Sequence, residues 1–162
     1  VTTADLHLSW DVAYEPGVIK AVGHKNGKPI VEEIHTAGKP AALRLTTDTG
    51  TISADGGDVA LVHADVIDNQ GNVVPDAGNQ INFTVKGSGK LIGVDNGNPR
   101  DDGSFKLSYR KAFNGHAFAV IRSDGKPGDI SVTVEADGLK PATLDIQSRH
   151  TPSEIMTFDD LK

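Results

Sequence analysis

The sequence predicts an all-β protein: an immunoglobulin-like β-sandwich, preceded by part of a second β-sandwich. Eighteen Gly and eight Pro are spread along the 162 residues, between short segments rich in Val, Ile and Thr. This pattern is typical of many strands joined by turns. Several segments alternate with a period of two, and almost none shows helical periodicity. The chain is long enough for one large domain or two small sandwiches, but an eight-stranded α/β barrel needs roughly 250 residues.

Residues 1–38 are expected to form three strands. The segment 6–12 alternates, and its in-phase apolar residues are Leu6, Leu8, Trp10 and Val12. Strands over 18–25 and 29–35 flank Asn26-Gly27, a strong hairpin signal because both residues tolerate the positive φ of a type I′ turn. Three strands cannot close a sandwich. We therefore interpret residues 1–38 as the C-terminal strands of a truncated immunoglobulin-like domain.

Two further features suggest that this first segment belongs to something longer. Val18 and Val22 lie opposite Ile19 and Ala21 on their strand, which predicts a second apolar face left exposed. The chain also starts at Val1 rather than Met, directly before a strand-like segment. We expect that the chain was cut from a longer protein.

Residues 39–148 are expected to form the complete immunoglobulin-like domain, after a turn-prone junction at 36–40. Its predicted strands are 41–47, 58–68, 80–86, 90–94, 104–110, 116–123, 129–136 and 141–147. Three of them alternate clearly, through Ile81, Phe83 and Val85, through Phe105, Leu107 and Tyr109, and through Ile130, Val132 and Val134. This number and spacing of strands fits a sandwich. A β-barrel of similar size is the alternative.

Residues 149–162 do not continue the strand pattern. Ser153 could cap a short helix over 154–161, with Ile155, Phe158 and Leu161 near one side. The alternative is a frayed tail.

Composition argues against several classes of partner. The net charge is −6 and the basic residues are scattered among acidic ones, so no nucleic-acid surface is expected. No run of about 18 apolar residues is present, so we expect no membrane insertion. Without cysteine, the chain can form neither a disulfide nor a thiolate metal site.

No metal or cofactor site is predicted. The segment 94–102, VDNGNPRDD, crowds three carboxylates and two Asn together, which resembles an oxygen-ligated Ca²⁺ site, but it lacks the spacing of an EF-hand. A structural loop is favoured, because Asn and Asp are ordinary turn residues. The residues Asp65, Asp68, Asn69 and Asn72 are likewise interpreted first as a hairpin turn. The six histidines show no zinc-binding spacing.

No catalytic residue is predicted, since no G-x-S-x-G motif accompanies the plentiful Ser and Asp. Sugar binding by a β-domain usually needs exposed aromatic rings, and the candidate carbohydrate contacts are Trp10, Tyr14 and Tyr109. Trp10 is in phase with Leu6 and Leu8, and Tyr109 with Phe105 and Leu107. We therefore favour a core position for Trp10 and Tyr109 over a sugar platform.

Several segments together resemble a known family. WDVAYEPGVIKAVGHKNGKPI at 10–30 and HTAGKPAALRLTTD at 35–48 resemble the junction between two β-sandwich domains downstream of the barrel of family 2 glycoside hydrolases. VIDNQGNVVPDAGNQINFTVKGSGKLIGVDNGNP at 66–99 and SFKLSYRKAFNGHAFAVIRS at 104–123 are similar to the last such domain in β-galactosidases of gut Bacteroidetes. The resemblance fades after about residue 148.

This resemblance implies a non-catalytic accessory region of a retaining β-galactosidase that uses the two-carboxylate mechanism. The family's two catalytic glutamates belong to a barrel outside this sequence, and none of Glu15, Glu32, Glu33, Glu135 and Glu154 has the matching context. The implied partners are the catalytic barrel and neighbouring sandwich domains of the parent chain, with carbohydrate as a further candidate. The family also implies a periplasmic, secreted or cell-surface protein.

Two other functions fit an immunoglobulin-like strand pattern. The chain could be a spacer repeat of a bacterial surface protein or adhesin, or a carbohydrate-binding module. Neighbouring sequence distinguishes the spacer from the glycosidase, because tandem sandwiches favour the spacer and an upstream barrel with paired glutamates favours the enzyme.

Overall fold

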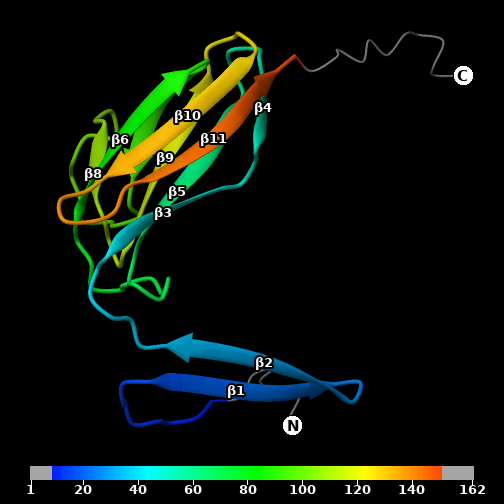
Figure 1. Cartoon of the computed structure of the whole chain (residues 1–162), viewed down its shortest axis with the longest axis vertical. Coiled ribbons are helices and arrows are strands. Elements are labelled where there is room, and N and C mark those ends of the chain that lie inside the picture. The colour runs from blue at the N-terminus through cyan, green and yellow to red at the C-terminus, as the bar shows by residue number, and fades with distance from the viewer. Residues whose placement is uncertain (1–8, 151–162) are drawn as a thin grey trace, which may run out of the picture. The chain divides into compact units, whose positions relative to one another are not determined.

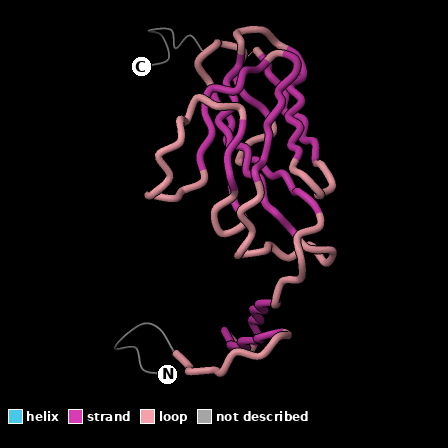
Figure 2. The backbone as a smooth tube through the Cα atoms, turned by 90° about the vertical axis from the view of Figure 1, so that its left-hand side faces the viewer, coloured by secondary structure: helices cyan, strands magenta, loops and turns pink. Residues whose placement is uncertain are grey.

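The computed structural model describes residues 9–150, and the chain divides into two compact units, Val1–Thr36 and Ala37–Lys162. Every regular element among the described residues is a β-strand (Figure 2). The predicted all-β class is therefore confirmed. The helix considered over 154–161 lies outside the described residues. No described residue belongs to a helix that is long and apolar enough to cross a membrane.

The first unit contains a β-hairpin of β1 (Val18–Lys25) and β2 (Lys28–His35) (Figure 1). Asn26 and Gly27 both have positive φ, 53° and 75°, as a type I′ turn requires. At the open end, the Thr36 N–H donates to the Gly17 carbonyl oxygen at 2.8 Å, and the Gly17 N–H donates to Thr36 Oγ1 at 3.0 Å. The predicted hairpin and its Asn26-Gly27 turn are confirmed.

The predicted strand over 6–12 is not found in its described part. Residues 9–12 are not in a strand, and residues 6–8 lie outside the described residues. Trp10, favoured as a core residue, is 71% exposed. Alternation shows which side chains share a face, but they are buried only if a second layer covers that face. In the described part of this unit, every residue of β1 and β2 is exposed.

The second unit is a sandwich of two sheets (Figure 1). The first sheet has the order β4-β11-β10-β6-β8. Its strands are β4 (Thr51–Ser53), β6 (Gln80–Gly87), β8 (Tyr109–Lys111), β10 (Gly128–Glu135) and β11 (Ala142–Arg149). The pairs are antiparallel, except that β4 runs parallel to β11.

The second sheet has the order β3-β5-β9-β7, with all pairs antiparallel. Its strands are β3 (Ala42–Thr47), β5 (Val59–Ile67), β7 (Gly89–Asp95) and β9 (His116–Ser123). Seven strands of the sandwich correspond to predicted segments: β3, β5, β6, β7, β9, β10 and β11. The short strand β4 was not predicted, because three residues are too few to show alternation.

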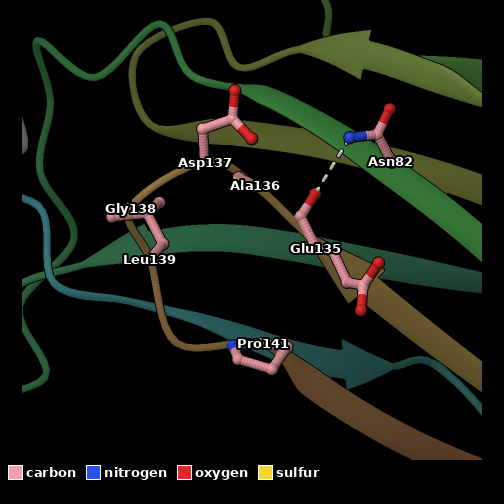
Figure 3. Close-up of a pocket in the computed structure, with 7 residues that line it drawn as sticks. All are labelled: Asn82, Glu135, Ala136, Asp137, Gly138, Leu139 and Pro141. Atoms are coloured by element: carbon pink, nitrogen blue, oxygen red, sulfur yellow. Dashed lines mark hydrogen bonds between the residues drawn. The ribbon is translucent and has the colours of Figure 1, made fainter.

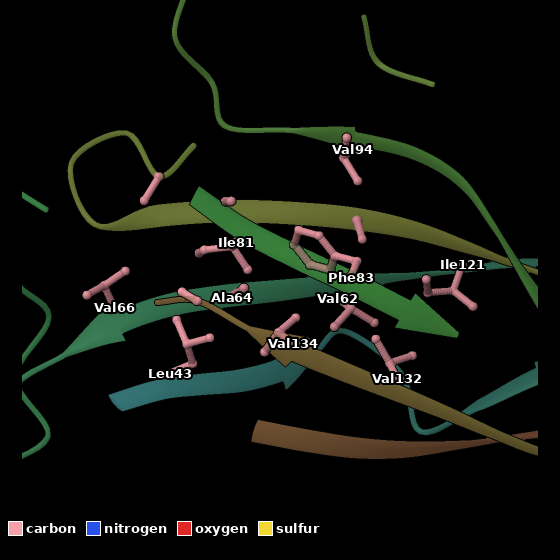
Figure 4. Packing of buried hydrophobic residues seen from close by; sticks show 14 of the residues in the cluster. Leu43, Val62, Ala64, Val66, Ile81, Phe83, Val94, Ile121, Val132 and Val134 are labelled. Carbon is pink, nitrogen blue, oxygen red and sulfur yellow. The ribbon is translucent and has the colours of Figure 1, made fainter. Parts of the chain in front are cut away.

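The inner faces of the two sheets form the core of the second unit (Figure 4). Ile81 and Phe83 of β6 are 0% and 3% exposed, and Ile121 of β9 is 0% exposed. Burying a side chain of this size stabilises the fold by about 1.5–3 kcal/mol. The alternation predicted for 81–85 and 130–134 is confirmed.

Gly87 ends β6 where the chain crosses from one sheet to the other. Its φ is +89°, a conformation that other residues adopt at a cost. A Cβ at this position would also collide with the carbonyl oxygen of Asp129 on neighbouring β10. This crossing therefore requires glycine for both torsional and steric reasons.

The predicted strand over 104–110 is largely wrong. Only β8 forms there, and the preceding residues belong to a loop that begins after β7. Phe105 and Tyr109, expected on the core face, are 56% and 39% exposed, whereas Arg110 is 3% exposed. The apparent alternation combines loop residues with a short strand in which Arg110, and not Tyr109, faces the core.

Candidate functional site

The loop between β7 and β8 is organised around the buried guanidinium of Arg110. Arg110 Nη1 donates to the Gly103 carbonyl oxygen at 2.7 Å, and Nε lies 3.2 Å from Asp101 Oδ2. Nη2 lies 3.8 Å from Asp95 Oδ1, and the guanidinium carbon lies 5.2 Å from the Phe105 ring centroid. Arg110 lies on the edge strand β8, opposite Ile81, whose side chain faces the core. The guanidinium therefore points into the sandwich at the edge of the sheet.

The polar residues of this loop cap backbone groups, as expected for a structural loop. Asn98 Oδ1 accepts the Arg100 N–H, and Asp101 Oδ1 accepts the Gly103 N–H at 2.9 Å. The Gly103 N–H lowers the pKa of Asp101, with smaller contributions from Asn96 and Arg110. Within residues 9–150, no group of three or more His, Asp or Glu side chains is placed to hold a metal.

A second polar cluster crosses the outer face of the other sheet. Asp65 Oδ2 accepts from Arg44 Nη2 at 2.7 Å, and Asp65 Oδ1 lies 2.9 Å from His116 Nδ1. The register places these three residues side by side on β3, β5 and β9. Asp65 is thus a strand residue, and its assignment to the hairpin turn was wrong. The alternation of β5 could have shown this, because Asp65 lies in phase with exposed His63.

Asp68 joins the turn after β5 to the start of the sandwich. Its carboxylate accepts the N–H groups of Gln70 and Asn72 and the Gly38 N–H at 2.7 Å. The Gly38 N–H makes the largest contribution to lowering its pKa to about 2, and Asn72 and Gln70 lower it further. The turn predicted over 68–72 is confirmed. Its contact with Gly38 was not expected from the sequence.

The two outer faces of the sandwich differ in chemistry. The five-stranded sheet presents polar side chains such as Asn82, Thr84 and Thr133, whereas the four-stranded sheet presents Leu61 and Val120 opposite each other. On the latter face the Phe118 ring packs against His63, with ring centroids 6.1 Å apart. Leu61 is 36% exposed. The four-stranded sheet therefore offers the more apolar surface.

One open hollow of about 330 Å³ lies at the end of β10 (Figure 3). It is lined by Asn82 of β6, by Glu135, and by the turn that carries Asp137 and Gly138. Asn82 Nδ2 donates to the Glu135 carbonyl oxygen at 3.4 Å. The lining is mainly polar, so this hollow suits a hydroxyl-bearing ligand better than an apolar one.

The three candidate carbohydrate contacts are divided between the two units. Trp10 and Tyr14, 71% and 75% exposed, belong to the first unit, and Tyr109 belongs to the second. Tyr109 does not line the hollow itself, but it pairs with Asn82, which does. In the sandwich, Glu135 is the only glutamate among the described residues, so this part of the chain contains no pair of glutamates.

Two family models match the chain. The model for glycoside hydrolase family 2 C-terminal domain 5 matches residues 43–145. A domain of unknown function matches residues 2–31. The division between the matches falls in the same region as the division between the two compact units.

Individual proteins show the same relationship. The β-galactosidase BoGH2A of Bacteroides ovatus is 48% identical over 145 residues, covering 89% of this chain and 17% of that protein. A β-glucuronidase of Formosa agariphila is 33% identical, covering 85% of this chain and 14% of that protein. The crystal structure of a family 2 glycosyl hydrolase from Bacteroides cellulosilyticus matches with a TM-score of 0.80 and 31% identity, covering 88% of this chain and 18% of that chain.

The chain thus spans less than a fifth of the length of these relatives, and its sandwich matches a C-terminal domain. The described residues contain the sheets, core and loops of that domain, and no barrel. The chain belongs to glycoside hydrolase family 2, as a non-catalytic C-terminal region.

Proposed function

We propose that this region supports a retaining β-galactosidase whose two catalytic carboxylates lie in a barrel elsewhere in the parent protein. The observation that carries this proposal is the 48% identity to a β-galactosidase over 89% of the chain. The β-glucuronidase is less similar, at 33%. The family match disfavours the surface spacer repeat, and periplasmic or cell-surface export is proposed from the family alone.

The proposed role is structural: the region packs against the catalytic barrel and a neighbouring sandwich domain. The hairpin exposes apolar side chains, including Ile34 at 72%, and residues 1–38 would complete an immunoglobulin-like domain with strands from the parent chain. Residues 39–148 would form the last domain. Its apolar outer face, centred on Leu61 and Val120, is the surface we expect to contact a neighbour.

The direct test compares this chain with the full-length gene product on chromogenic β-galactoside and β-glucuronide substrates. We expect hydrolysis by the full-length protein alone, with the galactoside preferred. Activity of the 162-residue chain would overturn the accessory role. An inactive full-length protein, or one that prefers the glucuronide, would overturn the proposed activity.

A paired substitution tests the docking face. In the full-length protein, Leu61→Asp should lower the Tm and shorten the half-life of activity, because it places a charge in the proposed contact. Thr84→Asp, on the exposed outer face of the other sheet, is the matched control and should change neither. In the isolated chain both substitutions should have small effects. Equal behaviour of the two variants in the full-length protein would argue against this face.

A further inference from the structure

A row of exposed side chains crosses the outer face of the five-stranded sheet beside the hollow. Tyr109 of β8 pairs with Asn82 of β6, and Asn82 pairs with Glu135 of β10. Directly opposed residues in antiparallel strands have Cβ atoms about 4.5–5.5 Å apart. Tyr109 is 39% exposed, and the other two residues are exposed. An aromatic ring, an amide and a carboxylate thus lie side by side.

Two residues of this row, Asn82 and Glu135, line the hollow at the end of β10 (Figure 3). Asp137 lies on the turn above the hollow, and Pro141 lines it from the start of the following strand segment. Among the described residues, the carboxylates of Glu135 and Asp137 make no hydrogen bond or ion pair, whereas Asn82 donates to a backbone oxygen. Two accepting groups are therefore free to bind a ligand.

We infer that this row and hollow bind a neutral glycan. The Tyr109 ring can pack against the apolar face of a pyranose, because aromatic side chains combine a flat apolar surface with a wet edge. Carboxylates accept hydrogen bonds from sugar hydroxyls, and the Asn82 amide can both donate and accept. The two carboxylates would repel a uronate, so the preferred glycan carries no negative charge. The site is open and has few contacts, so we expect millimolar affinity.

This face is a poorer surface for binding a protein. Beside the row, the sheet continues with Thr84, Thr133 and Thr143. The hydroxyl groups of Thr133 and Thr143 form a hydrogen bond of 3.0 Å. Centres of protein interfaces are more apolar and aromatic than this. On the outer face of the opposite sheet, Val59 and Leu61 are exposed, and Leu61 lies opposite half-buried Val120. The polar face thus favours a hydroxyl-rich ligand.

The test is a two-dimensional ¹H–¹⁵N NMR titration of the 162-residue chain with a neutral β-linked galacto-oligosaccharide. In parallel, the chain is titrated with an oligosaccharide of the same length that carries glucuronate. We expect the neutral sugar to shift the resonances of Asn82, Tyr109 and Asp137, and the charged sugar to leave them unchanged. Tyr109→Ala and Asp137→Ala should each weaken binding at least about five-fold.

Tyr14→Ala is the matched control, since Tyr14 is also exposed but belongs to the other unit; it should bind like the unmodified chain. Dispersed spectra of the variants would show that they remain folded. Absence of shifts at high sugar concentration, shifts centred on Trp10 or Tyr14, or equal binding of the charged sugar would each overturn the inference. The inference is independent of which glycoside the parent protein hydrolyses, so its failure leaves the proposed function intact.

Discussion

The hairpin and the sandwich use the same kinds of residue with opposite results. β1 and β2 are rich in Val and Ile and are joined by a favourable Asn-Gly turn, yet all their residues are exposed. β5 and β10 have similar compositions, and their inward residues Val62 and Val132 are 0% exposed. In these four strands, local sequence predicts both that a strand forms and which side chains share a face. A packed second layer determines whether that face stabilises the protein.

The largest contrast between the two regions is expected on truncating a core aromatic residue. Phe83→Ala should lower the free energy of unfolding of the sandwich by about 3–5 kcal/mol, because it removes a packed ring from between the sheets and leaves a cavity. Phe83 is 3% exposed. The measurement is urea unfolding followed by circular dichroism. Tryptophan fluorescence is unsuitable, because Trp10 belongs to the other unit. A decrease in the free energy of unfolding of less than about 1 kcal/mol would mean that the core is not packed as described.

Removal of the buried cation at the sandwich edge should have the next largest effect. Arg110→Met should lower the free energy of unfolding by about 3 kcal/mol, the lower end for a broken buried ion pair. The lower end is appropriate because the side chains of Asp95 and Asp101 are 33% and 23% exposed and can be hydrated. Arg100→Met, at an exposed position in the same loop, is the control. An equal effect of both substitutions in urea unfolding would refute a special role of Arg110.

A smaller, pH-dependent effect is expected at Asp68. Its pKa in the folded state is about 2, below the ordinary value of 3.8, so the folded state favours the ionised carboxylate. This contribution to stability is complete above about pH 5 and is lost as the pH falls toward 2. Asp68→Asn should therefore lower the Tm by several degrees at pH 7, and by progressively less as the pH decreases.

The control for Asp68 is Asp76→Asn, because Asp76 is exposed and lies in the same stretch between β5 and β6. Thermal unfolding of the three proteins at several pH values is the measurement. A Tm difference between Asp68→Asn and the unmodified chain that stays constant from pH 7 to pH 2 would show that the Gly38 contact does not depend on the carboxylate charge.

Most of the fold could be predicted from the sequence, because seven sandwich strands and the hairpin are long enough to show alternation or are bounded by clear turns. The region around 104–110 could not. Phe105, Leu107 and Tyr109 alternate in sequence, but Phe105 belongs to the loop before β8, where its ring packs against Arg110 instead of continuing the sheet. A buried arginine is rare, and its burial depends on two aspartates that only the folded chain brings to it.

The candidate site was less predictable than the fold. Tyr109 was a candidate from its residue type alone, but its neighbours Asn82 and Glu135 come from strands far apart in the sequence. Sheet register brings these residues together, and single-sequence patterns do not determine which strands are neighbours. The same reason explains why the Arg44, Asp65 and His116 ladder was missed.

The smallest effect of a substitution on the stability of this chain is expected in the hairpin. This small effect would distinguish the hairpin directly from the sandwich. Ile34 is 72% exposed, so Ile34→Ala should change the free energy of unfolding of this chain by no more than about 0.5 kcal/mol. In a longer version that includes the preceding part of the parent protein, the same substitution should cost about 2 kcal/mol or more, because a second layer would bury Ile34. Thermal and urea unfolding of both lengths, with exposed Lys20→Ala as the control, measures the difference. A negligible effect in the longer protein would mean that the hairpin remains uncovered, and would remove the argument that residues 1–38 complete a neighbouring domain.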